Sequence, residues 1–406
     1  MTATIRTYDW TQAEERLLFV RWFVALGLLS TLVLTYPLWL TSARTFPLVP
    51  LLPAAGTFST PLDWLALAAL FLSTCWFWLS PSSVPIVIFL ADALLLGLQD
   101  QNRLQSWLLS FALMMGAFLP HLRRGSRAWS ALQTLRLLQG VTWATYFWSG
   151  LLKINPDYFT QIVPSVLEEL TAHAPLIKIP MHGALLALPA FEVVGALLLL
   201  FRPARHVAVV MLVATNIIAL TAFGPLGLLW HRSGWPWLMA LALITPRLFW
   251  NSSASAREIL LPPTFISKGI FLALCVVLPA LGCFGRWDPH LSFGLFSGRA
   301  AVGSVVVEQS AYDELPKAIR RAATQVGEQG YYRIQLQHWS EVDTGAPPSA
   351  RASVLRESAQ SLCQFIAPKE PLLVGIEHPA KIPWLDSPVQ EKLTCDGMRL
   401  VPHSGD

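Results

Sequence analysis

The 406-residue sequence contains little charge for its length. Asp, Glu, Lys and Arg together make up 13% of the residues, whereas soluble domains carry about 25%. Hydrophobic residues reach 54%. This composition excludes an ordinary soluble globular protein and indicates an integral membrane protein.

Motifs that would indicate a particular chemistry are also absent. The chain has no GxGxxG, P-loop, GxSxG or HExxH sequence, so it carries no common signature of nucleotide, serine-hydrolase or zinc-protease chemistry. It has no CxxC and no cluster of cysteine and histidine, so no metal site is predicted. Because no basic patch with interleaved aromatic residues occurs, we expect no nucleic-acid partner.

What the sequence does contain is a series of apolar segments about as long as a bilayer-spanning helix, which needs roughly 20 residues. We predict nine spans, with eight as an alternative because the third and the eighth are short. The spans cover residues 17–40, 63–80, 84–99, 104–121, 132–152, 183–201, 206–223, 235–250 and 267–285. The expected fold is therefore an all-α polytopic membrane bundle surrounded by a lipid bilayer.

Lysine and arginine are unevenly distributed over the predicted loops. If the N-terminus is cytoplasmic, the inner segments hold ten of these residues and the outer loops hold five. This bias predicts a cytoplasmic N-terminus and an extracytoplasmic C-terminal region. We favour a multi-pass protein of a bacterial inner membrane.

The composition changes after Gly285, so we divide the chain into a transmembrane domain, residues 1–286, and a soluble tail, residues 287–406. The tail contains 11 Lys and Arg against 14 Asp and Glu, a net charge of about −3. Strands are predicted at 303–310 and 331–342, and helices at 312–327 and 349–367. This pattern indicates a small extracytoplasmic α+β domain.

Two of the five cysteines lie in this tail. Cys363 and Cys395 would face an oxidising exterior on the predicted topology. A disulfide between them is one alternative and two free thiols are the other, and the sequence leaves both open.

Lys153 ends the fifth predicted span, in the stretch YFWSGLLKIN. The polar residues of this span recur at steps of three and four and therefore share one helix face; they are Gln139, Thr142, Tyr146, Ser149, Gly150 and Lys153. Polar groups in hydrocarbon need partners, so such a stripe lines either a helix contact or a cavity. Lys153 either extends its ammonium to the lipid headgroups or faces a poorly hydrated pocket, where its amine is a usable general base.

Few other ionisable side chains fall within the spans. Glu192 and Asp92 are candidates for ion pairing or for a functional site, whereas Arg21 and Arg136 are expected to anchor helix ends at the interface. Between the fifth and sixth spans, residues 165–179 show an amphipathic pattern. This pattern predicts either a surface helix over the outer mouth of the bundle or a plain connector.

The stretch LQGVTWATYFWSGLLKINPDYF contains a Tyr-Phe pair, a small residue with glycine, a lysine, and an aromatic residue after a turn. These are Tyr146 and Phe147, Ser149 and Gly150, Lys153, and Tyr158 or Phe159. This arrangement resembles the membrane domain of the vitamin K-dependent γ-carboxylase and its bacterial relatives, the horizontally transferred transmembrane (HTTM) family. Downstream, FEVVGALLLL is similar to the glutamate-bearing helix of that family. The resemblance covers roughly residues 15–285.

The resemblance implies a reduced quinone, similar to vitamin K, as a lipophilic cofactor, with Lys153 as the catalytic base that deprotonates it. It also implies a carboxylase-like lyase reaction on a peptide or protein substrate. The residues that would bind or orient the ligand are Tyr146, Gly150, Asn155, Asn102 and Glu192. The sequence departs from the family at Asn102 and Asn216, where relatives often carry histidine, and its tail is shorter than the carboxylase's luminal region.

Two functions therefore remain open at the level of sequence. The first is a quinol-using membrane enzyme in which Lys153 acts as general base. The alternative is a non-enzymatic membrane component that binds or handles a peptide or protein partner, as an accessory in maturation, immunity or export. The first requires a usable amine in a pocket, and the second gives the tail the larger role.

Overall fold

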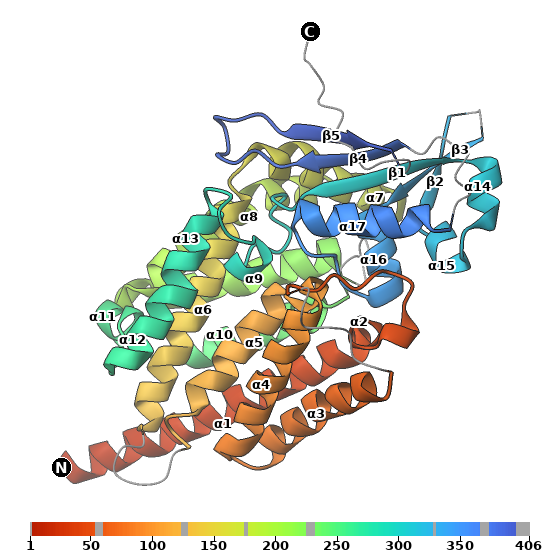
Figure 1. Cartoon of the computed structure of the whole chain (residues 1–406). Helices are drawn as coiled ribbons and strands as arrows, with labels where there is room; N and C mark the ends of the chain where they lie inside the picture. The colour runs from red at the N-terminus through yellow and green to blue at the C-terminus, as the bar shows by residue number, and fades with distance from the viewer. Residues whose placement is uncertain are drawn as a thin grey trace.

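The structure is a computed structural model that describes residues 2–52, 60–122, 129–173, 178–224, 232–327, 330–365 and 373–394. It consists of a helical bundle and a smaller domain with one β-sheet. Figure 1 shows the N-terminus at the end of the bundle that lies farthest from the sheet.

The bundle contains helices at the positions of all nine predicted spans. They are α1 (Thr2–Leu34), α3 (Thr60–Leu79), α4 (Ser83–Gln99), α5 (Ser106–Phe118), α6 (Ala131–Lys153), α8 (Lys178–Leu199), α9 (Arg205–Phe223), α10 (Gly234–Phe249) and α12 (Phe265–Leu272), which continues through a π-helical turn into α13 (Leu278–Gly282). Shorter helices are α2 (Tyr36–Trp39), α7 (Val163–His173) and α11 (Ala256–Leu260).

Five helical segments within the described residues are long and apolar enough to cross a membrane. They are Gln12–Leu34, Pro61–Leu79, Ile179–Leu199, Arg202–Phe223 and Phe265–Gly282. Helices α4 and α5 are apolar but shorter, and α10 has only 16 residues. Helix α6 is 23 residues long, but its polar stripe lowers its hydropathy. The helical membrane bundle is thus supported, while nine spans remain a prediction.

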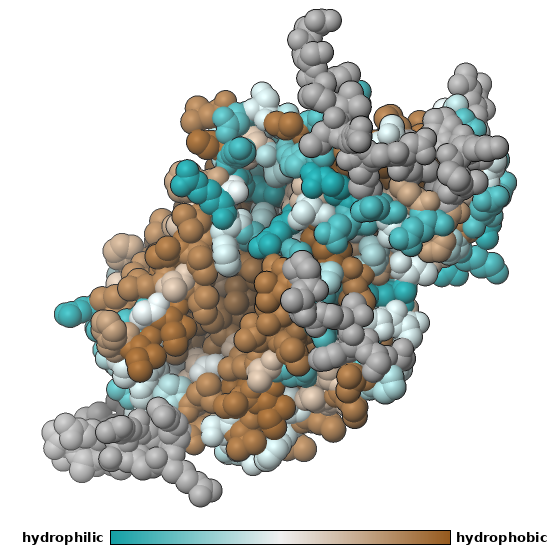
Figure 2. Space-filling view, viewed as in Figure 1, coloured by the Kyte–Doolittle hydropathy of each residue, from teal (hydrophilic) through white to brown (hydrophobic). Residues whose placement is uncertain are grey.

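The outer surface of the bundle is apolar. Large side chains such as Leu72, Leu94, Val210 and Phe265 are exposed on four different helices. Figure 2 shows hydrophobic residues covering the helical part of this face and hydrophilic residues gathered over the sheet domain. A contiguous apolar surface of this extent is rare on soluble monomers and suits contact with lipid.

The smaller domain is built on a five-stranded antiparallel sheet in the order β2-β3-β1-β4-β5. The strands are β1 (Val302–Glu308), β2 (Ala323–Val326), β3 (Tyr331–Gln335), β4 (Leu373–His378) and β5 (Val389–Leu393). Four helices accompany it: α14 (Gln309–Glu314), α15 (Lys317–Arg320), α16 (Leu336–Thr344) and α17 (Ala352–Cys363). The predicted α+β tail is therefore present.

Two predictions of elements in the tail were wrong in part. The helix expected over 312–327 is interrupted at Pro316, because proline disfavours helical backbone at the residue before it, and Leu315 is extended with ψ of 146°. Its last part is not helical either, because Ala323–Val326 forms strand β2 and pairs with β3. The strand expected over 331–342 ends at Gln335. From there α16 buries Leu336, Trp339 and Ser340, which is helical rather than alternating spacing.

The amphipathic segment after α6 forms helix α7 within residues 163–173. Its buried side chains include Val163, Val166, Leu167 and Leu170, and Glu168 and Glu169 lie on the exposed side. The structure therefore shows a helix up to His173, while its position over the outer mouth of the bundle stays a prediction. Residues 174–177 lie outside the described residues.

Candidate functional site

Lys153 does not extend to the surface of the bundle. Its Nζ atom lies 2.7 Å from Oε2 of Glu192 on α8 and donates a second hydrogen bond of 2.6 Å to Oγ of Ser149. Lys153 and Glu192 are only 3% and 6% exposed. Of the two placements considered for Lys153, the structure therefore shows the buried one. It also pairs Lys153 with Glu192, which the sequence analysis named separately.

A close contact between α6 and α8 makes this pair possible. A Cβ atom added to Gly150 would lie 2.7 Å from Cβ of Glu192 and 2.8 Å from the carbonyl oxygen of Pro189. Glycine is thus required for α8 to pass at this distance. Gly150, which the resemblance assigned to ligand binding, thus lies against the backbone of α8.

Pro189 lies inside α8, three residues before Glu192. Proline has no backbone N–H, so the carbonyl of Leu185 one turn earlier loses its usual helical donor. The hydroxyl of Tyr158 donates to that carbonyl over 3.0 Å and replaces the missing bond. Tyr158, from the motif after Lys153, therefore supports the helix that carries Glu192.

Tyr146 lies two helical turns from Lys153 in a buried hydrogen-bond chain that joins α6, α9 and α10. Asn216 donates to the Tyr146 hydroxyl over 2.6 Å, and the hydroxyl lies 2.9 Å from Oγ1 of Thr245. Because Thr245 donates its own proton to the carbonyl of Leu241, Tyr146 must donate to Thr245. The phenol is held in one orientation.

These residues surround one small cavity between α6, α8, α9 and α10. Lys153, Glu192, Ser149, Tyr146 and Asn216 are on its wall, and its volume is about 20 Å³, roughly the room that one water molecule needs. It is closed on one side by Leu295 and Phe296, from the segment that leads into the sheet domain. Phe296 stacks on Phe223 of α9 with ring centres 4.0 Å apart.

Trp237 of α10 also lines the cavity. It is 3% exposed, and its indole N–H has no hydrogen-bond partner among the described residues. A buried donor without a partner is costly, so this N–H favours a hydrogen-bond acceptor, such as water or a ligand oxygen, in the adjoining space.

Asn155 lies just beyond α6 and is bonded away from the cavity. Its side chain donates to the carbonyls of Leu152 and Ser297 and accepts from the backbone N–H of Tyr158. These three bonds use the hydrogen-bonding capacity of the amide almost fully. Asn155 fixes the turn after Lys153 and does not line the cavity.

Asn102 belongs to a different buried cluster, at the junction of the bundle and the sheet domain. Its Nδ2 atom donates to Asp100 over 2.9 Å, and its Oδ1 atom accepts from the backbone N–H of Ser349 over 3.0 Å. Nearby, Asp100 pairs with Arg44 at 2.5 Å. The structure does not bring Asn102 together with Lys153.

Two residues of the site, Thr245 and Trp237, were not named from sequence. Ser149 was named, but its hydrogen bond to Lys153 was not predicted. Asn216 was noted only as a departure from the HTTM pattern. A polar side chain inside an apolar helix was the available signal for Asn216 and Thr245, but a helix pattern does not reveal which neighbouring helix it faces.

No group of three or more histidine, cysteine, aspartate or glutamate side chains suited to a metal occurs among the described residues. Cys363 is disulfide-bonded, and Cys75, Cys275 and Cys283 are free. Cys395 lies outside the described residues, so its pairing with Cys363 stays a prediction.

Comparison with known proteins found no matching family model, no matching curated protein and no matching solved structure. The resemblance to the HTTM family therefore remains a prediction that is based on the residues quoted above.

Proposed function

We propose that the protein is a membrane-embedded enzyme in which Lys153 acts as a general base on a lipophilic ligand, most simply a reduced quinone. The observation that carries the proposal is the buried Lys153–Glu192 pair on the wall of a small cavity within an apolar bundle. Ionisable residues buried in membrane helices are costly and commonly mark functional sites.

The pair itself supplies a route to a neutral amine. Nζ of Lys153 donates a hydrogen bond of 2.7 Å to Oε2 of Glu192. Transfer of that proton from Nζ to Oε2 leaves an uncharged amine without changing the net charge of the buried site. The amine would then accept a proton from a ligand hydroxyl, and Ser149 and Glu192 would hold the resulting ammonium.

A reduced quinone would supply an acidic hydroxyl and, after deprotonation, electrons for chemistry on a second substrate. The residues present fit such a hydroxyl, because an amine, a phenol and an unpartnered indole N–H line one cavity. A quinone ring exceeds a volume of about 20 Å³. Binding therefore requires the wall to open, and Leu295 and Phe296 form the part of the wall that is not helical.

The test is extraction of bound lipids and quinones from the purified protein, followed by mass spectrometry. Wild type is expected to retain a quinone, and Lys153→Ala and Glu192→Gln are expected to lose most of it while remaining monodisperse. Lys268→Ala, which removes a lysine of α12 that is not on the cavity wall, serves as the matched control. Equal quinone content in all four proteins, or none in any, would contradict the proposed cofactor.

The alternative function is a non-enzymatic component that binds a peptide or protein through the sheet domain. Its supporting observation is the small size of the cavity, in which the Lys153–Glu192 pair is already satisfied. This alternative predicts that Lys153→Ala leaves cellular function intact, whereas substitutions on the sheet domain abolish it. A complementation assay with both classes of variant separates the two functions.

A further inference from the structure

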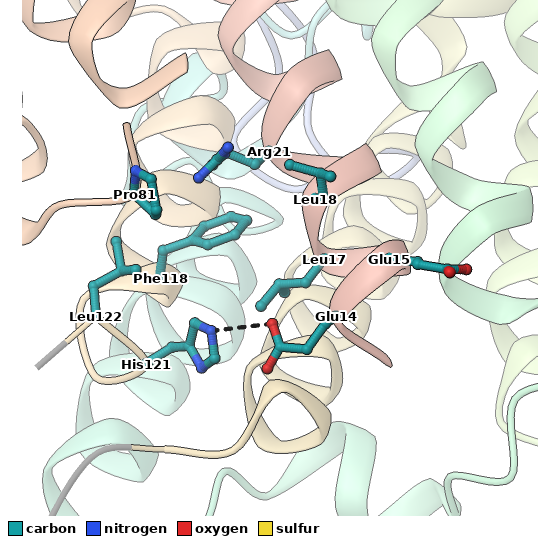
Figure 3. Close-up of a pocket in the computed structure, with 9 residues that line it drawn as sticks. All are labelled: Glu14, Glu15, Leu17, Leu18, Arg21, Pro81, Phe118, His121 and Leu122. Atoms are coloured by element: carbon teal, nitrogen blue, oxygen red, sulfur yellow. Dashed lines mark ion pairs between the residues drawn. The ribbon is translucent and has the colours of Figure 1, made fainter. Parts of the chain in front are cut away.

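A second pocket lies at the end of the bundle opposite the sheet domain. It has a volume of about 440 Å³ and is formed by α1, the end of α5 and the turn between α3 and α4. Figure 3 shows its side chains. It shares no residue with the cavity at Lys153, so it is independent of the proposed function.

Most of the pocket wall is apolar. Leu17 and Leu18 of α1 face Phe118, Leu122 and Pro81 from the other elements. Leu18 is also 47% exposed on the surface of the bundle. The pocket is therefore continuous with surface that suits lipid, and a hydrocarbon chain could enter it from the side.

Arg21 is the cation of this pocket. It lies seven residues beyond Glu14, which is about 10 Å along the helix axis, and inside the segment Gln12–Leu34 that is apolar enough to cross a membrane. Its guanidinium extends sideways from α1 toward Pro81 and Phe118 rather than toward the helix end (Figure 3). Arg21 has no hydrogen bond or ion pair among the described residues, and its Nε atom is buried.

The carboxylates near the pocket are not placed to neutralise Arg21. Glu14 lies at the mouth, with Oε2 3.5 Å from Nε2 of His121, and Figure 3 shows Glu15 directed away from the pocket. The other ring nitrogen of His121 is 3.0 Å from the carbonyl oxygen of Trp129. Arg21 is thus a guanidinium with apolar neighbours, and such a charge in a membrane is normally paired.

We propose that this pocket binds an anionic amphiphile, with a phosphate or carboxylate group at Arg21 and part of its chain against Leu17, Leu18 and Phe118. A guanidinium binds either anion through charge-assisted hydrogen bonds. The same chemistry is offered by an acidic phospholipid and by a free fatty acid. The neutral headgroup of phosphatidylcholine carries a phosphate but no net charge and would bind more weakly.

The experiment uses the full-length protein in detergent with three probes: phosphatidylglycerol, oleate and phosphatidylcholine. Native mass spectrometry counts adducts over a range of probe concentrations. We expect phosphatidylglycerol or oleate to bind wild type, and Arg21→Gln to weaken that binding about tenfold or more, the usual effect of losing a charge-assisted bond. Arg21→Lys should retain part of the affinity because it keeps the charge.

Arg16→Gln is the matched control, because Arg16 lies on the same helix but lines a different hollow with Arg247. Leu122→Trp fills the pocket while keeping Arg21, and it should block binding as strongly as Arg21→Gln. This second variant tests the proposal even if Arg21→Gln does not fold. Preference for phosphatidylglycerol or for oleate identifies the source of the anion. Equal binding to wild type, Arg21→Gln and Leu122→Trp, or equal binding of phosphatidylcholine, would overturn the proposal.

Discussion

Lys153 contacts two oxygen atoms whose loss would have different effects. Ser149 lies one turn earlier on the same helix, and its neutral hydroxyl contributes about 1.5–3 kcal/mol, as a hydrogen bond to a charged group does. Glu192 comes from a neighbouring helix and carries the opposite charge. Removing it would leave a buried cation without its counter-ion, which typically costs about 3–5 kcal/mol.

Exchanging the charges of Lys153 and Glu192 distinguishes a structural ion pair from a catalytic one. Lys153→Glu and Glu192→Lys should each destabilise the bundle strongly, and the double variant should recover much of the lost stability because the pair is restored. If Lys153 is a base, the double variant should still lack function, since the amine now projects from α8. Thermal unfolding in detergent and a complementation assay measure the two effects. A double variant with full function would show that the pair is structural.

A second prediction concerns pH and the sheet domain. Two hydrogen bonds from Arg356, at 2.9 and 3.1 Å, hold the pKa of Glu391 below its usual range, and His378 adds to the effect against the opposing effect of burial. Because the folded-state pKa is lowered, the stabilisation is present above the unfolded value near 4.3 and is lost as the pH falls below it. The partners Arg356 and His378 are partly exposed to solvent, so the contribution is below about 1 kcal/mol.

Glu391→Gln should therefore speed hydrogen exchange of the β4 and β5 amides at pH 7, and the difference from wild type should shrink near pH 3. Glu377→Gln on β4 is the control, because Glu377 has no ion pair among the described residues. An effect of Glu391→Gln that is as large at pH 3 as at pH 7 would contradict this account.

At the scale of residues, the sequence analysis named polar residues that line the cavity but did not predict which of them pair. Lys153, Tyr146 and Glu192 were named because polar groups are rare in apolar helices, and all three line one cavity. Asn102 and Asn155 were named with them, yet both bond to backbone elsewhere. The partner of a polar side chain depends on how distant helices pack, and this does not follow from spacing within one helix.

At the scale of elements, the contact between α6 and α8 depends on Gly150. Gly150→Ala would place a Cβ atom within 2.9 Å of three atoms of α8. We expect a loss of about 1–3 kcal/mol in the free energy of unfolding from overpacking, together with weaker ligand binding because the Lys153–Glu192 distance changes.

Gly183→Ala is the control, because a Cβ atom there meets nothing within 4 Å. Alanine favours helix over glycine by about 1 kcal/mol, so this variant of α8 should be slightly more stable than wild type. Thermal unfolding of the two variants side by side measures the difference. If Gly150→Ala were as stable as Gly183→Ala, α8 would have to move away from α6 without a loss of free energy.

Long elements with strong periodicity were predicted well, and the nine predicted spans coincide with helices. The tail was harder. Residues 331–342 combine a strand with a helix. The boundary is marked only by the spacing of the buried residues, which changes from alternating to helical at Leu336. Strands β2, β4 and β5 were not predicted, since their stability comes largely from pairing with neighbouring strands.

At the scale of the whole molecule, the bundle and the sheet domain are joined through the segment after α2. Asp343 of α16 accepts hydrogen bonds of 2.6 Å from the backbone N–H groups of Thr45 and Phe46. Phe46 is 2% exposed and packs in the core of the sheet domain against Trp339. The change in composition near residue 286 thus does not separate two parts of the molecule that lack contact with each other.

Asp343→Ala should loosen this junction. Two backbone donors lose their acceptor, which typically costs about 1–3 kcal/mol, and the segment around Thr45 should become sensitive to added protease. Asp313→Ala is the control, because among the residues that the structure describes its carboxylate bonds only to the side chain of Gln309. Equal rates of cleavage in wild type and Asp343→Ala would contradict a role in joining the two parts.

The same contact has a consequence for biosynthesis. Thr45 and Asp343 are separated by 298 residues, so the early loop has no native acceptor until most of the chain has been synthesised. At about 5–20 residues per second, this interval lasts roughly 15 to 60 seconds. During that time the first helices are inserted while Phe46 still lacks its core. The newborn protein is therefore exposed to misfolding and proteolysis at the segment after α2, and a chaperone that shields this segment would act there.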